Sequence, residues 1–483
     1  DLVRSRGLGD VYKRQEKEIR IDVFQLDVPT ISIADADKGF KVLQGSELTI
    51  TPVVDSFLDT SYSWQINGQE VSTEPNYSFP TNELGEYDVR FSTHNEDGED
   101  EISFKVEVCS PDQIDFNWTF LQDEYNMSSG RTIQIKPVDI KNAQDAIYTW
   151  SVNNKQVQSG ASDSYLFTSD QEGEHTIKVE MKNSYILVTQ TLKVNVCPPE
   201  GTYQRKINAT SSASMNKVYE FLPAPGQFVN ENYTVTTMAE ACTYAEERIN
   251  QTAYVSLGGF GGYIIVGFDH SIVNDGDYNI AVTGNAFDGS SEPGIVWVMQ
   301  DENGDGLPND TWYELRGSEY GKAETWQDYA VTYHKPTGIQ LPTPWTDNHG
   351  QSGSIDYLGA FHRQDYYYPA WVKEKQYTLR GTRLKERNYD QSGNGTYWVN
   401  DSYEWGYADN FSAIDRLTDD DNYNAGPSDN HFKISHAVTF DGKDANLKYV
   451  DFIKVQVGVN SKSGWLGEIS TEVFGIKDFN MLK

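Results

Sequence analysis

Tyr62-Ser-Trp-Gln-Ile-Asn-Gly68 and Tyr148-Thr-Trp-Ser-Val-Asn-Asn154 are two copies of one short motif in this sequence. Further matches follow at offsets of 86 to 88 residues, and they pair Tyr77–Phe79 with Tyr165–Phe167, Gly85–Val89 with Gly173–Ile177, and Cys109 with Cys197. Each copy alternates short apolar strands with turn residues and carries one tryptophan in a central strand. This pattern predicts two β-sandwiches, with Trp64 and Trp150 in their cores rather than on a binding surface.

The two copies resemble PKD-like domains, which have an immunoglobulin-type fold. The resemblance rests on the tryptophan strand, on the Gly-Glu-Tyr-like turn at Gly85 and Gly173 that leads into a Val-rich strand, and on the Asn-containing strand end. We place the first sandwich at residues 29–110 and the second at residues 111–198. The resemblance implies that both act as spacers that hold a working domain away from a surface.

Composition narrows the class of protein. The chain has 483 residues, which is enough for about three domains, and its formal net charge is -33. Such acidity disfavours binding to a phosphate backbone, so nucleic acid is not an expected partner. It fits an external medium that contains calcium, although acidity that serves only solubility explains it equally well. The sequence has no apolar run of 18 residues, so no membrane-spanning helix is expected.

The N-terminal residues are excluded from the fold prediction. Asp10-Val-Tyr-Lys-Arg-Gln15 matches the translation of a transposase end sequence used to prepare sequencing libraries, so residues 1–15 are interpreted as an assembly artefact. Residues 16–28 are then a linker, and an export signal or lipid-anchor cysteine is expected upstream. The three cysteines, Cys109, Cys197 and Cys242, lack metal-ligand spacing. The sequence leaves open whether two of them form a disulfide.

Residues 199–216 form a Ser- and Asn-rich linker, and residues 217–483 form one further domain. Strand-like runs and Gly-rich turns predict a larger jelly-roll-like β-domain, with one helix at Met238–Arg248. The segment Gly258–His270 begins with four glycines, but no Lys-Ser/Thr pair follows them. A tight turn into a buried strand is therefore expected there instead of a phosphate-binding loop.

Asp301-Glu-Asn-Gly-Asp-Gly-Leu-Pro-Asn-Asp310 predicts a calcium loop within a β-hairpin. Oxygen-bearing side chains occupy positions one, three and five, and Gly306 stands at position six, where such a loop turns sharply. Its flanks, Gly294–Gln300 and Thr311–Leu315, are β-branched apolar runs that predict paired strands. The position-twelve residue is Trp312 and not the bidentate glutamate of an EF-hand, and a solvated turn is the alternative. The predicted ligands of this structural site are Asp301, Asn303, Asp305, the Leu307 carbonyl, Asn309 and Asp310.

Five blocks of this domain carry a second resemblance. They are Gly258–His270, Gly284–Gly294, the loop 301–310, Glu314–Gly321 and Gly464–Glu472. Together with the repeats they resemble a family of secreted or lipid-anchored surface proteins of the Bacteroides group, similar to BtuH-type cobalamin-capture proteins. The resemblance implies a location at the outer membrane, a corrinoid ligand and an outer-membrane transporter complex as partner.

Aromatic clusters in polar loops are the candidate ligand surface, because corrinoids and glycans both favour flat aromatic walls with polar edges. Core packing is the alternative for each residue alone. The histidines are scattered, and His431 and His436 are expected on opposite faces of one strand. The predicted ligand-binding residues are Tyr366, Tyr367, Tyr368, Trp371, Trp398, Trp405 and Trp465.

Three function classes stay open. The first is capture of a corrinoid such as cobalamin for outer-membrane uptake, without catalysis, and a glycan is the alternative ligand. The second is glycoside hydrolysis by two carboxylates, for which the acids in the distinctive blocks are Glu292, Glu314, Glu319, Glu468 and Glu472. The third is a structural adhesin, for which the repeats would suffice. No metalloprotease, serine-hydrolase or thiol-redox motif occurs, and the aromatic loops favour a binding protein.

Overall fold

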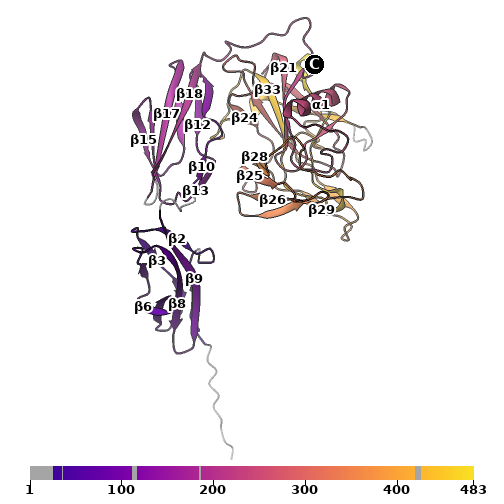
Figure 1. The fold of residues 1–483 in the computed structure, drawn as a ribbon. Coiled ribbons are helices and arrows are strands. Elements are labelled where there is room, and N and C mark those ends of the chain that lie inside the picture. The colour runs from indigo at the N-terminus through magenta and orange to yellow at the C-terminus, as the bar shows by residue number, and fades with distance from the viewer. Residues whose placement is uncertain (1–25, 35, 111–116, 184–186, 419–425) are drawn as a thin grey trace, which may run out of the picture. The chain divides into compact units, whose positions relative to one another are not determined.

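The computed structural model describes residues 26–34, 36–110, 117–183, 187–418 and 426–483, and the protein is mainly β (Figure 1). Residues 1–15, predicted to be an artefact, and most of the 16–28 linker lie outside this description. The chain divides into two compact units. One runs to Trp118 and includes Asp139–Ile147 and Met181–Val188; the other contains Thr119–Val138, Tyr148–Glu180 and Thr189–Lys483.

The first sandwich contains a five-stranded sheet of order β2-β9-β8-β5-β6 and the smaller pairs β1-β4 and β3-β7. Trp64 is fully buried, as predicted, its ring lies 4.4 Å from that of Phe91, and its Nε1 donates to the Glu74 carbonyl at 2.9 Å. The strands are β1 (Thr30–Ser32), β2 (Phe40–Leu43), β3 (Leu48–Ile50), β4 (Val53–Asp55), β5 (Ser61–Ile66), β6 (Gln69–Ser72), β7 (Tyr77–Phe79), β8 (Gly85–His94) and β9 (Glu99–Cys109).

The second sandwich repeats this topology, with sheet order β11-β18-β17-β14-β15 and a parallel first pair as in the first sandwich. Trp150 is fully buried and stacks on Tyr165, so the sequence repeat is also a repeat of core and sheet order. The strands are β10 (Asn117–Thr119), β11 (Glu124–Ser128), β12 (Thr132–Ile135), β13 (Asp139–Lys141), β14 (Ile147–Val152), β15 (Lys155–Gly160), β16 (Tyr165–Thr168), β17 (Gly173–Lys182) and β18 (Leu187–Cys197).

The larger β-domain contains a six-stranded, a four-stranded and a three-stranded antiparallel sheet, of orders β19-β21-β33-β23-β24-β32, β27-β26-β25-β28 and β31-β22-β35. Its first strands are β19 (Lys217–Leu222), β20 (Val255–Ser256), β21 (Tyr263–Val273), β22 (Ile280–Gly284), β23 (Gly294–Met299), β24 (Trp312–Leu315), β25 (Trp326–His334), β26 (Thr343–Asp347) and β27 (Ser352–Ile355). The remaining elements are β28 (Gln376–Arg383), β29 (Asn388–Asp390), β30 (Trp398–Asn400), β31 (Ser428–Phe432), η2 (Ile434–His436), β32 (Ala437–Val438), β33 (Tyr449–Val457), η3 (Gly464–Leu466), β34 (Glu472–Val473), β35 (Gly475–Asp478) and η4 (Phe479–Met481).

The three sheets share one apolar core, to which β21, β23 and β33 contribute long runs of buried residues. The predicted mainly-β class is confirmed. The glycines before Tyr263 lead into β21, as expected for a tight turn before a buried strand. β23 and β24 pair antiparallel across Met299↔Trp312, which is the predicted hairpin.

The predicted helix is α1 (Met238–Asn250), labelled in Figure 1. It packs beside β19. Thr237 caps its N-terminus by accepting a hydrogen bond from the Glu240 N–H. Ala241, Ala245 and Ile249 recur every four residues and are buried on one face, as helical periodicity requires.

No described helix could cross a bilayer. The three cysteines, Cys109, Cys197 and Cys242, are free thiols.

Candidate functional site

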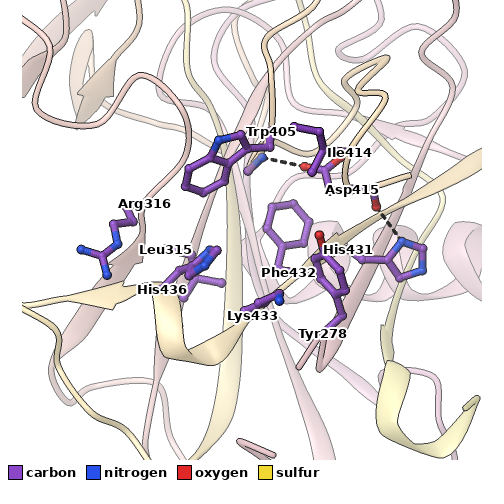
Figure 2. A pocket seen from close by; sticks show the side chains of 11 residues that line it. Tyr278, Leu315, Arg316, Trp405, Ile414, Asp415, His431, Phe432, Lys433 and His436 are labelled. Carbon is purple, nitrogen blue, oxygen red and sulfur yellow. Dashed lines mark hydrogen bonds between the residues drawn. The ribbon is translucent and has the colours of Figure 1, made fainter. Parts of the chain in front are cut away.

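A pocket of about 240 Å³ lies where η2, β31 and the loop around Trp405 meet (Figure 2). Aromatic and nitrogen-bearing side chains alternate around it, with Trp405 beside His436 and Tyr278 beside Lys433. Its lining residues are Tyr278, Leu315, Arg316, Trp405, Gly406, Ile414, Asp415, His431, Phe432, Lys433 and His436.

The two histidines of this pocket correct a prediction. His431 and His436 were expected on opposite faces of one strand, but β31 ends at Phe432 and the 3-10 turn η2 follows. The strand alternation therefore stops between them, and both line the same pocket (Figure 2). His431 Nδ1 forms a 2.7 Å hydrogen bond with the Asp415 carbonyl, which fixes the orientation of its ring.

Trp405 contributes an aromatic ring to the pocket, and Arg316 and Lys433 contribute positive charge. The half-buried Trp405 ring lies 5.1 Å from the ring of His436. Arg316 forms an ion pair with Asp444, and Lys433 Nζ lies 4.6 Å from the Tyr278 ring centroid. Burial, followed by the charges of Arg316 and Lys433, lowers the pKa of His436. This histidine is therefore a neutral ring at pH 7, able to donate or accept a hydrogen bond.

Within the described part of the chain, Asp415 is the one carboxylate that lines this pocket. Its Oδ2 accepts the Gly406 N–H at 2.6 Å, and its Oδ1 accepts the Asn430 amide at 2.9 Å. Burial raises its pKa. Because both oxygens are committed to neighbouring donors, Asp415 holds the two sides of the pocket together and orders its wall.

Three of the predicted ligand-binding aromatics belong to the domain core. Tyr367, Tyr368 and Trp371 are buried, so the prediction that this tyrosine run presents a surface is wrong for them. The segment is not a strand, and consecutive tyrosines therefore need not alternate between faces. Tyr367 donates to the His362 carbonyl and Tyr368 to the Glu374 carbonyl. Tyr366 is half-buried and packs against the same core.

Trp398 and Trp465 lie outside the 240 Å³ pocket and close to each other's segments. Trp465 is 50% exposed and its ring lies 6.3 Å from that of the exposed Phe361. Gly464, at φ +56°, packs so closely on the Trp398 indole that a Cβ there would lie 2.2 Å from its Nε1. Of the predicted aromatic set, only Trp405 lines the 240 Å³ pocket.

The predicted metal loop is a tightly hydrogen-bonded turn between β23 and β24. Asp301 is buried, and its Oδ1 and Oδ2 accept the N–H groups of Gly304 at 2.8 Å and Gly306 at 3.1 Å. Both glycines have positive φ, 75° and 72°, which side chains with a Cβ rarely adopt. The two glycines thus allow the backbone to wrap around the Asp301 carboxylate.

The remaining predicted ligands lie in the same turn. Asp305 Oδ2 accepts hydrogen bonds from the Asn303 and Asn309 amides, both at 2.9 Å, and Leu307 is 48% exposed. Asn309 Oδ1 and Asp310 Oδ1 are buried and lack a hydrogen-bond partner. Burial raises the pKa of Asp310 to about 8. Oxygen donors of this kind fit a hard cation such as calcium.

One further acidic group exists in the described part of the chain. Glu292, Asp409 and Glu472 each bring a carboxylate oxygen to within 4.8 Å of the others. Burial, followed by the neighbouring carboxylates, raises the pKa of both Asp409 and Glu472. Glu292 and Glu472 were predicted as candidate acids, but Asp409 was not, because it stands outside the five blocks. Arg316, Lys433 and Tyr278 were likewise not predicted as pocket residues.

Comparison with known proteins identifies the N-terminal repeats. A model of the PKD-like domain matches residues 28–95 and 113–183. The fibronectin(III)-like modules of Clostridium thermocellum CbhA are 14% identical, cover 35% of this chain and 95% of their own, and give a TM-score of 0.23. The N-terminal Ig1-2 module of the Drosophila receptor protein tyrosine phosphatase DLAR is 14% identical, with coverage of 35% and 98% and a TM-score of 0.18. No curated protein matches the sequence significantly. The chain therefore carries two PKD-like domains in tandem, ahead of a larger antiparallel β-domain.

Proposed function

We propose that this protein is a cell-surface binding protein that captures a small ligand in the pocket beside Trp405, with its PKD-like domains as spacers. The observation that carries the proposal is the pocket itself, which is lined by one tryptophan together with two histidines, an arginine and a lysine. A concave site with an aromatic wall and a few convergent polar groups is the usual form of a small-molecule site.

The pocket volume favours a saccharide over a corrinoid. Pockets that enclose drug-sized ligands measure about 300–1,000 Å³, and this pocket measures about 240 Å³. It therefore suits one ring-sized polar group, such as a terminal sugar stacked on Trp405 with its hydroxyls toward His431 and His436. A corrinoid, which the resemblance to BtuH-type proteins implies, would reach this pocket only with a peripheral group.

Binding without catalysis is the proposed mode. Hydrolysis of a glycosidic bond requires two carboxyl groups on either side of the scissile bond. Among the residues that the structure describes, Asp415 is the only carboxylate that lines the pocket, and both of its oxygens are engaged by Gly406 and Asn430. The five glutamates considered for hydrolysis do not line it. The alternative to a binding protein is a structural adhesin, which would have no small-molecule ligand.

Calcium at the loop 301–310 is part of the proposal, as a structural ion. Asp301, Asn303, Asp305, the Leu307 carbonyl, Asn309 and Asp310 are the proposed ligands. Support comes from Asn309 Oδ1 and Asp310 Oδ1, which are buried without a partner and would gain one in a cation. Binding there would require the loop to rearrange, because Asp305 now accepts hydrogen bonds from two amides.

The proposed location is the outside of the cell, through a lipid anchor in the outer membrane, with an outer-membrane transporter complex as the recipient of the ligand. The spacer role of PKD-like domains and the net charge of -33 support an external setting. The lipoprotein and transporter elements rest on the resemblance of the five blocks to Bacteroides-group surface proteins.

Calorimetric titration of the full chain with cyanocobalamin, and then with a panel of neutral and acidic saccharides, tests the proposal. One saccharide should bind one-to-one, and Trp405→Ala should weaken its binding at least tenfold. Trp465→Ala is the matched control, because that exposed tryptophan lies outside the pocket, and it should bind as the wild type does. Binding that survives Trp405→Ala would move the ligand elsewhere, and tight cyanocobalamin binding would make the corrinoid the ligand.

A further inference from the structure

We propose that Glu292, Asp409 and Glu472 form a second divalent-cation site, for calcium, separate from the loop 301–310. One carboxylate oxygen from each residue lies within 4.8 Å of the other two. Calcium binds oxygen at about 2.3–2.6 Å, so two of its ligands lie at most about twice that distance apart. A single ion can therefore contact all three carboxylates without a large movement of the chain.

The backbone holds the three acids together from distant parts of the sequence. Asp409 Oδ1 accepts the Asn285 N–H at 2.8 Å, and its Oδ2 accepts the Glu472 N–H at 2.9 Å. Glu292 N donates to the Asp409 carbonyl, also at 2.9 Å. The blocks Gly284–Gly294 and Gly464–Glu472 thus meet at Asp409. Gly284 is needed for this contact, since a Cβ there would lie 2.5 Å from Asp409 Oδ1.

The charge of this cluster has no visible compensation. Asp409 is 1% exposed and Glu472 is 4% exposed. In the described part of the chain, no lysine, arginine or histidine forms an ion pair with any of the three acids. Burying ionised carboxylates without a partner is costly. Either shared protons or a bound cation must therefore offset the charge.

One buried oxygen favours the cation. Glu472 Oε1 is buried and has no hydrogen-bond partner, although buried polar atoms nearly always have one. A proton shared between Glu472 and Glu292 satisfies one oxygen of each residue and leaves this one unmatched. A calcium ion, which takes six to eight oxygen ligands, gives it a partner.

A second cavity offers a route to the cluster. It measures about 130 Å³ and is lined by Phe228, Glu231, Tyr254 and Ser256 among others. Ser256 pairs with Glu472 between β20 and β34, and its Oγ lies 2.6 Å from the Ser470 Oγ. Ser470 precedes Glu472 by two residues in the same segment. Polar groups therefore lead from this cavity to the three carboxylates.

Calcium titration of the full chain tests this site. The chain is dialysed against chelator, then against chelator-free buffer, and titrated calorimetrically with calcium chloride. The background is Asp305→Ala, which removes a central ligand of the loop 301–310. Adding Glu472→Gln should reduce the stoichiometry by one calcium. Glu468→Gln is the matched control, because Glu468 is equally buried and is not one of the three acids, and it should leave the stoichiometry unchanged.

Two results would overturn the site. One is an Asp305→Ala protein that binds no calcium, and the other is a stoichiometry that Glu472→Gln leaves unchanged; either result would assign the cluster to shared protons. If the Glu472→Gln protein fails to fold, Glu292→Gln provides the same test at a half-buried position, where the amide replaces the carboxylate with little change in packing.

Discussion

Glu314 and Lys454 are two ionisable residues whose side chains lie within the six-stranded sheet of the β-domain. Lys454 Nζ lies 4.8 Å from the ring centroid of Trp297 and 4.9 Å from that of Trp312. Glu314 is buried and accepts a hydrogen bond from the Thr382 hydroxyl. Burial raises the pKa of Glu314 to about 7 and lowers that of Lys454 to about 8. Both residues therefore favour their neutral forms more than they do in water.

Glu314 should make stability fall as pH rises from about 4.5 to about 7. The folded protein keeps its proton up to about pH 7, whereas the unfolded chain releases it near 4.5, so the folded state binds more protons across this window. The loss is on the order of 3 kcal/mol. Urea unfolding of wild type and Glu314→Gln at several pH values measures it.

The glutamine variant should lose this part of the pH dependence, while Glu374→Gln, at an exposed position, should keep it. A Glu314→Gln protein with the wild-type slope between pH 4.5 and 7 would contradict the assignment. Lys454 acts in the opposite sense and at higher pH, between about 8 and 10.5, because its folded pKa is lowered.

At the scale of elements, the β23–β24 hairpin contains both a turn that requires glycine at two positions and the proposed calcium site. Gly304 and Gly306 supply the positive φ values, and Asp301 accepts both of their N–H groups. The turn is thus formed by its own hydrogen bonds, and a cation would add stability only when bound. Loss of a proposed calcium ligand should therefore lower stability more in calcium than in chelator.

Asp305→Ala should lower the melting temperature in calcium by several degrees more than in excess chelator, where the variant loses only the hydrogen bonds that Asp305 accepts. The reason is that an ion which binds only the folded state stabilises it by mass action, and this variant removes one of the proposed oxygen donors for that ion. Differential scanning calorimetry in both buffers measures the effect, with exposed Asp288→Ala as the control. Equal losses in the two buffers would argue against a metal at this loop.

Elements with a clear period were predictable from sequence, and irregular segments were not. The hairpin strands, α1 and the cores around Trp64 and Trp150 follow from alternation, helical spacing and the repeat. Tyr367 and Tyr368 were misplaced because a strand rule was applied to a segment that is not a strand. His431 and His436 were separated for the same reason. Asp409 has no local signal, since only the meeting of three distant segments gives it neighbours.

At the scale of the whole molecule, the chain is built from units with separate cores. The first sandwich has its own apolar cluster around Trp64, Phe91 and Val106, and the β-domain has another, which includes Val296 and Ile453. The first of the two compact units contains the first cluster and the second contains the other. Domains with separate cores can unfold independently.

Thermal unfolding of the full chain should therefore show two transitions, and Trp64→Ala should move only one of them. Removing a buried tryptophan costs about 3–5 kcal/mol, and Trp64 lies in the core of the first unit. Phe57→Ala is the control, because Phe57 is 95% exposed and its removal leaves no cavity. Calcium should shift the other transition, which belongs to the unit that holds the loop 301–310. If Trp64→Ala and calcium moved the same transition, the two units would unfold as one cooperative body and the spacer role of the first sandwich would lose its thermodynamic basis.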